Sequence, residues 1–137
     1  EGGSIARGGR RPPELARGYF IEPTVIRGLT NDARVAREEI FGPVLVVLAH
    51  DGDADAVRIA NDSPYGLSAT VWGADPDRVG RVASGLRAGT VNVNGGVWYS
   101  ADVPFGGYKQ SGVGREMGLA GFEEYLETKI VATAGHL

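Results

Sequence analysis

The sequence predicts an α/β fold with a mainly parallel sheet and flanking helices. Between residues 44 and 94, strand-like segments rich in β-branched residues alternate with segments of helical periodicity. This alternation is typical of βαβ crossovers, which join parallel strands. A long glycine-rich segment, 95–114, follows the last of these strands. Ligands of open parallel sheets bind beyond the carboxyl ends of the strands, so this segment is a candidate site.

Composition excludes several classes of site. The chain has 137 residues, a net charge of −3, two His and no Cys. A disulfide, a Cys-ligated metal site and a cysteine nucleophile are therefore excluded within it, and we expect no metal site. The slightly acidic charge argues against a nucleic-acid partner. The longest apolar run, 44–49, is too short to span a membrane, and no secretory pattern opens the chain, so we expect a cytoplasmic protein.

The first third of the chain carries weak signals. Residues 1–17 are rich in Gly, Arg and Pro, and we expect a loop or frayed edge there. Residues 19–26 are β-rich, but Pro23 lacks a backbone donor, which predicts an irregular or edge strand. The polar segment 27–37 is expected to contain a helical turn after Asn31 or Asp32.

Stronger signals follow. The continuous aliphatic run 44–49 predicts a strand covered on both faces. Asp53 is the expected N-cap of a helix over 54–61, and 67–72 is the next expected strand.

The second half of the chain has a sharper helix signal. Asp75-Pro76 predicts a helix with Asp as N-cap and Pro at the first position, ending near Gly89. A strand is expected over 91–94, a short helix over 116–126 and a terminal strand over 128–133.

Aromatic residues mark the glycine-rich segment as a candidate pocket wall. Trp98, Tyr99 and Phe105 lie in a loop far longer than an ordinary crossover connection. They are expected either to line an apolar ligand pocket or to anchor a packed surface loop to the core.

Two carboxylates precede a backbone break at Gly42-Pro43. Either a carboxylate of this Glu38-Glu39 pair, beside Phe41, accepts paired hydrogen bonds from a ribose diol, or the two form a solvated helix end. Glu116 follows Gly112-x-Gly114 and is expected either to relay a proton or to pair with Arg115 at a helix start. That glycine pair lacks the third glycine of a dinucleotide fingerprint.

Five segments, in order, carry a family resemblance. They are GYFIEPTV (18–25), EEIFGPV (38–44), ANDSPYGL (60–67), GTVNVN (89–94) and PFGGYKQSG (104–112). Together they closely resemble the C-terminal part of the NAD(P)-dependent aldehyde dehydrogenase superfamily, over nearly the whole chain. The resemblance implies a portion of that family's catalytic domain over residues 1–126. It also implies an oligomerisation strand and tail over 127–137.

The resemblance assigns roles to residues that match the family motifs. Glu39 matches the glutamate that binds the nicotinamide-ribose hydroxyls, Phe41 the aromatic residue beside them, and Leu67 the aliphatic residue bordering the nicotinamide ring. Trp98, Tyr99 and Phe105 fall where the family lines its aldehyde tunnel. Glu116 matches a glutamate implicated in proton relay from the deacylation base. Asn94 and the glycines of PFGG are expected to hold the loop shape.

The implied reaction is oxidation of an aldehyde to a carboxylic acid with NAD or NADP. A cysteine thiolate attacks the aldehyde, hydride passes to the nicotinamide, and an activated water hydrolyses the thioester. In the family this cysteine lies several tens of residues before EEIFGPV, and no Cys precedes that motif here. Together with the missing initial Met, this predicts a C-terminal fragment that is inactive alone and partners the missing N-terminal part in a homo-oligomer.

The sequence leaves two functions open besides that of an enzyme fragment. The chain is either such a fragment or a stand-alone, non-catalytic assembly module that uses its terminal strand. A nucleotide-binding regulatory domain is the third alternative. A fragment is also expected to expose apolar area where the rest of the enzyme would cover it.

Overall fold

The computed structural model describes residues 2–97 and 99–135 and divides the chain into two compact units, Glu1–Pro64 and Tyr65–Leu137. Each unit is described by itself. Among the described residues, no helix is long and apolar enough to cross a membrane.

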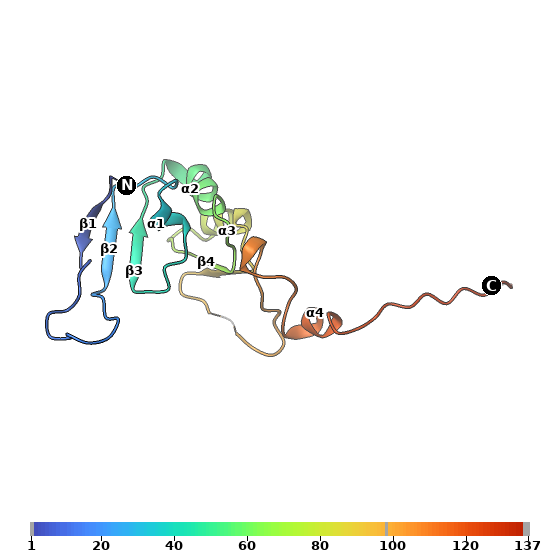
Figure 1. Cartoon of the computed structure of the whole chain (residues 1–137). Coiled ribbons are helices and arrows are strands. Elements are labelled where there is room, and N and C mark those ends of the chain that lie inside the picture. The colour runs from blue at the N-terminus through green and yellow to red at the C-terminus, as the bar shows by residue number, and fades with distance from the viewer. Residues whose placement is uncertain (1, 98, 136–137) are drawn as a thin grey trace. The chain divides into compact units, whose positions relative to one another are not determined.

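The first unit carries a mixed sheet of three strands, drawn side by side in Figure 1. Its order is β1 (Ser4–Arg7), β2 (Thr24–Arg27) and β3 (Val44–Val47). β1 pairs antiparallel with β2, and β2 pairs parallel with β3 from Thr24↔Val44 to Arg27↔Val47. The short helix α1 (Arg34–Arg37) precedes β3, and α2 (Gly52–Asn61) follows it.

Two expectations for this unit were wrong, and a third was correct only in part. Part of segment 1–17 is strand β1, whose residues are all exposed and give no hydrophobic period, and whose hydrogen bonds come from β2. β2 lies between β1 and β3 and is not an edge, which Pro23 permits because the strand begins immediately after it. Only the expected irregularity is present, in the register shift of its pairing with β1 between Ile5 and Arg7. β3 is not covered on both faces, since Leu45 and Val47 are 60% and 48% exposed.

The second unit contains a βαβ element. β4 (Ser68–Val71) pairs parallel with β5 (Thr90–Val93), and α3 (Pro76–Gly85) connects them. A 3₁₀ turn (Lys109–Ser111) and α4 (Gly118–Glu123) follow. The α/β class is thus confirmed, although the strands are divided between two sheets instead of forming one.

Of the helix ends expected from the sequence, one is confirmed and two are wrong. Asp75 caps α3 as expected, because its carboxylate accepts hydrogen bonds from Asp77 N at 3.0 Å and Arg78 N at 3.1 Å. The expected cap Asp53 lies inside α2, which begins at Gly52 without a side-chain cap bond. The C-cap of α3 is Leu86, so Gly89 lies beyond the helix.

The C-terminal segment also differs from expectation. The helix expected over 116–126 is the shorter α4, and residues 128–133 form no strand in this structure. Figure 1 shows the chain continuing past α4 as an extended trace. A strand needs a partner for its backbone groups, and none of the described strands pairs with this segment.

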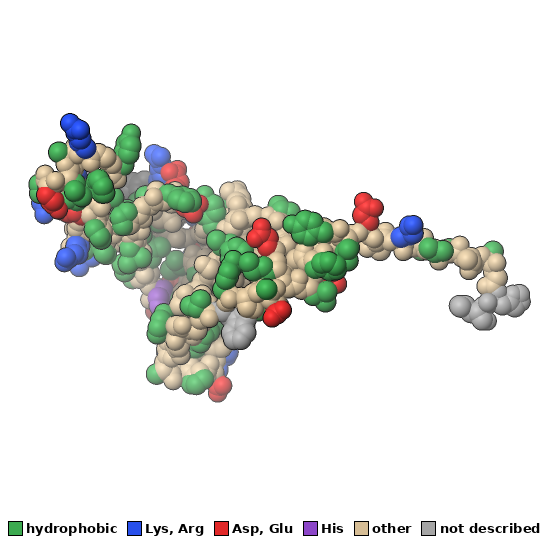
Figure 2. All heavy atoms as spheres, turned by 90° about the horizontal axis from the view of Figure 1, so that it is seen from below, with side chains coloured by type: hydrophobic (Ala, Val, Ile, Leu, Met, Phe, Trp, Pro, Cys, Tyr) green, Lys and Arg blue, Asp and Glu red, His purple; other side chains and the backbone are tan. Residues whose placement is uncertain are grey.

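The buried core of the described residues is small. Among their hydrophobic side chains only Val79 is buried, and Thr24 is the buried polar one. Hydrophobic side chains are correspondingly frequent on the visible surface in Figure 2. The exposed large hydrophobic side chains of the described chain include Phe20, Phe41, Trp72 and Phe122. This confirms the expected exposure of apolar area.

Candidate functional site

The first candidate group lies in the first unit, on the segment that joins α1 to β3. α1 ends at Arg37, and Glu38 donates its backbone N–H to Arg34 O at 2.9 Å before the chain becomes extended. Glu39 follows with an exposed side chain. Phe41 has a left-handed backbone, with φ of 52°, and a ring that is 91% exposed. Such a conformation is costly for a bulky residue and is found at ligand sites more often than elsewhere.

The downstream end of this segment is anchored by backbone bonds. Pro43 O accepts from Thr24 N at 2.8 Å, and Val44 N donates to Gly42 O at 2.8 Å. Glu38, Glu39 and Phe41 line an open hollow of about 440 Å³ with residues of α1 and β3. Carboxylate oxygens beside an exposed aromatic ring fit a sugar diol attached to a planar base, which is the chemistry expected for a ribose site.

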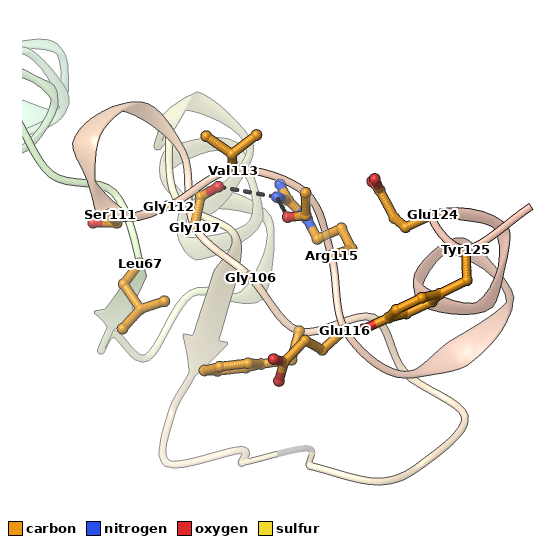
Figure 3. Close-up of a pocket in the computed structure, with 12 residues that line it drawn as sticks. Leu67, Gly106, Gly107, Ser111, Gly112, Val113, Arg115, Glu116, Glu124 and Tyr125 are labelled. Atoms are coloured by element: carbon orange, nitrogen blue, oxygen red, sulfur yellow. Dashed lines mark hydrogen bonds between the residues drawn. The ribbon is translucent and has the colours of Figure 1, made fainter.

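The second candidate group lies in the second unit, around a pocket of about 370 Å³ (Figure 3). Phe105 and Glu116 form an isolated antiparallel bridge, with both N–H···O bonds at 2.7 Å. Leu67 lines the same pocket, next to the strand β4. Tyr99 packs edge-on against Phe105, with ring centroids 5.7 Å apart and planes at 77°. The structure therefore brings four of the expected residues together.

Glycines allow the backbone segments of this pocket to approach closely. A side chain at Gly89 would overlap the carbonyl oxygen of Gly106. Gly66 O accepts from both Gly89 N at 3.0 Å and Tyr108 N at 2.8 Å. Gly66 N donates to Ser111 Oγ at 2.9 Å. This close packing, together with the positive φ of Gly106, explains why glycine recurs in the segment.

Asn94 has the structural role expected for it. It has a left-handed φ of 50°, which Asn tolerates better than most residues. Its side-chain amide accepts from Gly73 N at 2.8 Å and donates to Gly73 O at 2.9 Å. These bonds hold the start of the glycine-rich segment against the end of β4.

Glu116 has a different setting from the one expected. It lies two residues before α4, in the bridge with Phe105, rather than in the first turn of a helix. Its carboxylate is exposed. Among the described residues no ion pair joins it to Arg115. The remaining expected residue, Trp98, lies outside the described residues.

Arg115 is a pocket residue that the sequence reasoning missed as such. Its Nη1 donates to Gly107 O at 2.9 Å and to Gly114 O at 2.7 Å, as Figure 3 shows. Its guanidinium carbon also lies 5.4 Å from the centroid of the Tyr108 ring. No local sequence pattern indicates this role, because both hydrogen bonds go to backbone carbonyls. Arg115 therefore ties the two sides of the pocket together.

Two carboxyl groups with lowered pKa values lie near the ends of α2. The pKa of Asp55 is lowered by the Asp51 backbone N–H and by Arg58. The pKa of Asp62 is lowered by hydrogen bonds from Asn31 and Arg37. Within the described residues, no cluster of three or more His, Cys, Asp or Glu side chains has the arrangement of a metal site.

Comparison with known proteins matches residues 1–131 to the aldehyde dehydrogenase family. A betaine aldehyde dehydrogenase from Bacillus subtilis is 47% identical over 133 residues, which cover 96% of this chain and 27% of that protein. The chain thus spans about a quarter of the length of such curated relatives.

Solved structures agree with the sequence match. A betaine aldehyde dehydrogenase from Staphylococcus aureus, in complex with NAD+, superposes with a TM-score of 0.87 at 47% identity. The match covers 93% of this chain and 26% of the Staphylococcus aureus chain. Aldehyde dehydrogenase C from Pseudomonas syringae, a C291A mutant in complex with NAD+ and octanal, has a TM-score of 0.86 at 50% identity and the same coverage. The chain belongs to the aldehyde dehydrogenase family.

Proposed function

We propose that the chain is the C-terminal portion of an NAD(P)-dependent aldehyde dehydrogenase and supplies cofactor-ribose and substrate-pocket residues. The observation that carries the proposal is the gathering of Leu67, Phe105 and Glu116 around one pocket, with Tyr99 packed on Phe105. These positions come from separate segments of the chain. All lie within the residues that match the family.

The cofactor role rests on the first unit. Glu39 and Phe41 fit the ribose and nicotinamide end of NAD(P), because an exposed carboxylate and an exposed ring line one hollow. Glu39 would accept hydrogen bonds from the ribose hydroxyls, and Phe41 would cover an apolar face of the cofactor. The cofactor, when bound, supplies a hydride acceptor. NAD+ is present in the solved complexes of two relatives, which supports NAD+ as the first cofactor to test.

The substrate role rests on the second unit. Tyr99 and Phe105 supply an aromatic wall that would exclude water from an aldehyde, and Leu67 adds an aliphatic side chain to the lining of the same pocket. The exposed carboxylate of Glu116 would accept and pass a proton during thioester hydrolysis. The nucleophilic thiolate must come from outside these 137 residues, because they contain no Cys.

The experiment that tests this proposal compares two proteins. The complete product of the gene encoding this chain should form NADH from NAD+ and short aldehydes. The 137-residue chain alone should form none, since it lacks the nucleophile. Reproducible NADH formation by the chain alone, or none by a folded complete product across an aldehyde series, would contradict the proposal.

We further propose that residues 127–137 form an oligomerisation strand and tail. Ile130 and Val131 support this, because they are 89% and 78% exposed and belong to no sheet of the described chain. Pairing with another subunit would satisfy their backbone groups and cover their side chains. Removal of 127–137 from the complete product should lower its sedimentation coefficient. An unchanged assembly would favour another interface.

A further inference from the structure

Three polar residues close a ring of hydrogen bonds beside residues 38–43, which join α1 to β3 and are called the Glu39 segment below. Asn31 Nδ2 donates to Asp62 Oδ2 at 2.9 Å, and Arg37 donates to Asp62 Oδ2 at 3.3 Å and Oδ1 at 3.4 Å. Arg37 Nη1 also donates to Asn31 O at 3.4 Å, which completes the ring. We call Asn31, Arg37 and Asp62 the 31–37–62 cluster. It attaches the chain just before α1, at Asn31, and the last residue of α1, Arg37, to the C-terminal end of α2.

The cluster supplies hydrogen-bond donors and positive charge at the C-terminal end of α2. The last carbonyls of a helix lack intrahelical partners and carry partial negative charge. Asn31 Nδ2 donates to Asp62 O at 2.7 Å and to Ile59 O at 3.3 Å, and Ile59 O also accepts from Asp62 N at 3.2 Å. Asp62 adds a full negative charge at the same end, and the guanidinium of Arg37 offsets it. The lowered pKa of Asp62, caused first by Asn31 and then by Arg37, agrees with this geometry.

α1 depends on such external contacts for its order. It has four residues, no buried side chain and no side-chain bond at its N-cap, Ala33. A single helical turn fixes many backbone angles for one hydrogen bond and is unstable in isolation. Arg37 is its last residue and lies two positions before Glu39. Any loosening of α1 therefore reaches Glu39 through Glu38, whose N–H bonds to Arg34 O.

We propose that the 31–37–62 cluster positions Glu39 and Phe41 for the cofactor, by holding α1 on the end of α2. This inference rests on the cofactor role proposed above for those two residues. The cluster fixes the upstream end of the segment, as the Thr24–Pro43 hydrogen bond fixes its downstream end. Its members are positioning residues, since they act through the backbone of residues 37–39.

Positioning can be separated from global stability. The Arg37 and Asp62 side chains are 36% and 45% exposed, and ion pairs at this exposure contribute little to the free energy of unfolding. Loss of the cluster should therefore change local order and cofactor affinity more than the unfolding midpoint. A merely structural role would move these quantities together.

The test uses the complete product of the gene with Asp62→Ala as the main variant. Asp55→Ala is the matched control, because Asp55 lies on the same helix, bonds Arg58 at 2.7 Å and also has a lowered pKa. Asp62→Ala should speed hydrogen–deuterium exchange in peptides covering 34–43 by about tenfold. It should also raise the KM for NAD+ by about fivefold with kcat within about twofold, whereas Asp55→Ala should change neither. Asp62→Asn, which keeps an acceptor oxygen, should restore part of both effects.

Glu39→Gln, measured in parallel, separates this inference from the proposed function. Unchanged exchange in Asp62→Ala overturns the inference. A raised KM in Glu39→Gln without one in Asp62→Ala also overturns it and leaves the proposed role of Glu39 intact. If Glu39→Gln itself leaves the KM unchanged, the proposed cofactor role fails and the inference that rests on it falls too. Equal effects of Asp62→Ala and Asp55→Ala would reduce the cluster to a general structural contact.

Discussion

The Glu39 segment and the Phe105–Glu116 bridge are held in different ways. Backbone bonds secure the bridge, at 2.7 Å in both directions, and glycines let its neighbouring segments approach. The Glu39 segment instead follows a single helical turn that polar side chains attach to α2, and it contains a strained residue, Phe41. Loss of a side chain should therefore disturb the Glu39 segment, whereas an added side chain should disturb the region of the Phe105–Glu116 bridge.

The largest expected effect is that of Gly89→Ala, on the bridge side of this comparison. Its new Cβ would overlap Gly106 O, and a backbone atom cannot move aside as a flexible side chain can. We expect a loss of about 3 kcal/mol or more in the free energy of unfolding, measured by urea denaturation.

Gly80→Ala is the matched control for that substitution. Gly80 lies within α3 with nothing inside 4 Å of the added carbon. The free energy of unfolding of Gly80→Ala should rise by about 0.5–1 kcal/mol, because Ala has a higher helix propensity than Gly. Similar stability for the two variants would show that the close approach does not hold the bridge region.

A smaller effect is expected for Thr24→Val, which keeps the backbone bond to Pro43 O and removes only the hydroxyl bonds at the start of β2. Thr24 is 5% exposed, and its hydroxyl accepts from Gly9 N at 2.8 Å and donates to Glu22 O at 2.7 Å. Valine keeps the shape and leaves both groups unpaired, at a cost of about 1–3 kcal/mol. Thr70→Val, at an exposed position of β4, should stay within about 0.5 kcal/mol in the same denaturation series.

The smallest effect concerns pH and the 31–37–62 cluster. The pKa of Asp62 is depressed in the folded protein, so its ionised form stabilises the fold above the unfolded carboxyl pKa of about 4. That contribution is lost as pH falls through the folded pKa. The difference in urea midpoint between wild type and Asp62→Asn should therefore shrink from pH 6 to pH 3. At pH 6 this difference in urea midpoint should be smaller when both proteins also carry Asn31→Ala. A difference in midpoint that does not change with pH would contradict this linkage.

Local chemistry explains which elements could be predicted. Asp75-Pro76 combines a cap and a compatible first residue, so the start of α3 follows from two adjacent side chains. β1 has no such signal, since all its residues are exposed and its order comes from β2. The division of the strands into two sheets likewise depends on long-range pairing, which local periodicity does not encode.

The candidate site shows the same division. Motif resemblance placed Leu67, Phe105 and Glu116 in one site, and the structure places them around one pocket. The roles of Arg115 and Asp62 could not be predicted, because they arise from contacts with backbone carbonyls and with residues distant in sequence. Glu116 was expected at a helix start because the bridge to Phe105 has no local sequence signal.

The central claim is that Glu39, and not its neighbour, binds the cofactor ribose. Glu38 and Glu39 are adjacent and both exposed, but Glu38 pairs with Arg34 at 2.9 Å. The most direct measurement is the KM for NAD+ of the complete gene product carrying Glu39→Gln or Glu38→Gln. We predict a rise of about tenfold for Glu39→Gln and less than about twofold for Glu38→Gln. Equal values for the two variants, or a larger rise for Glu38→Gln, would contradict the account.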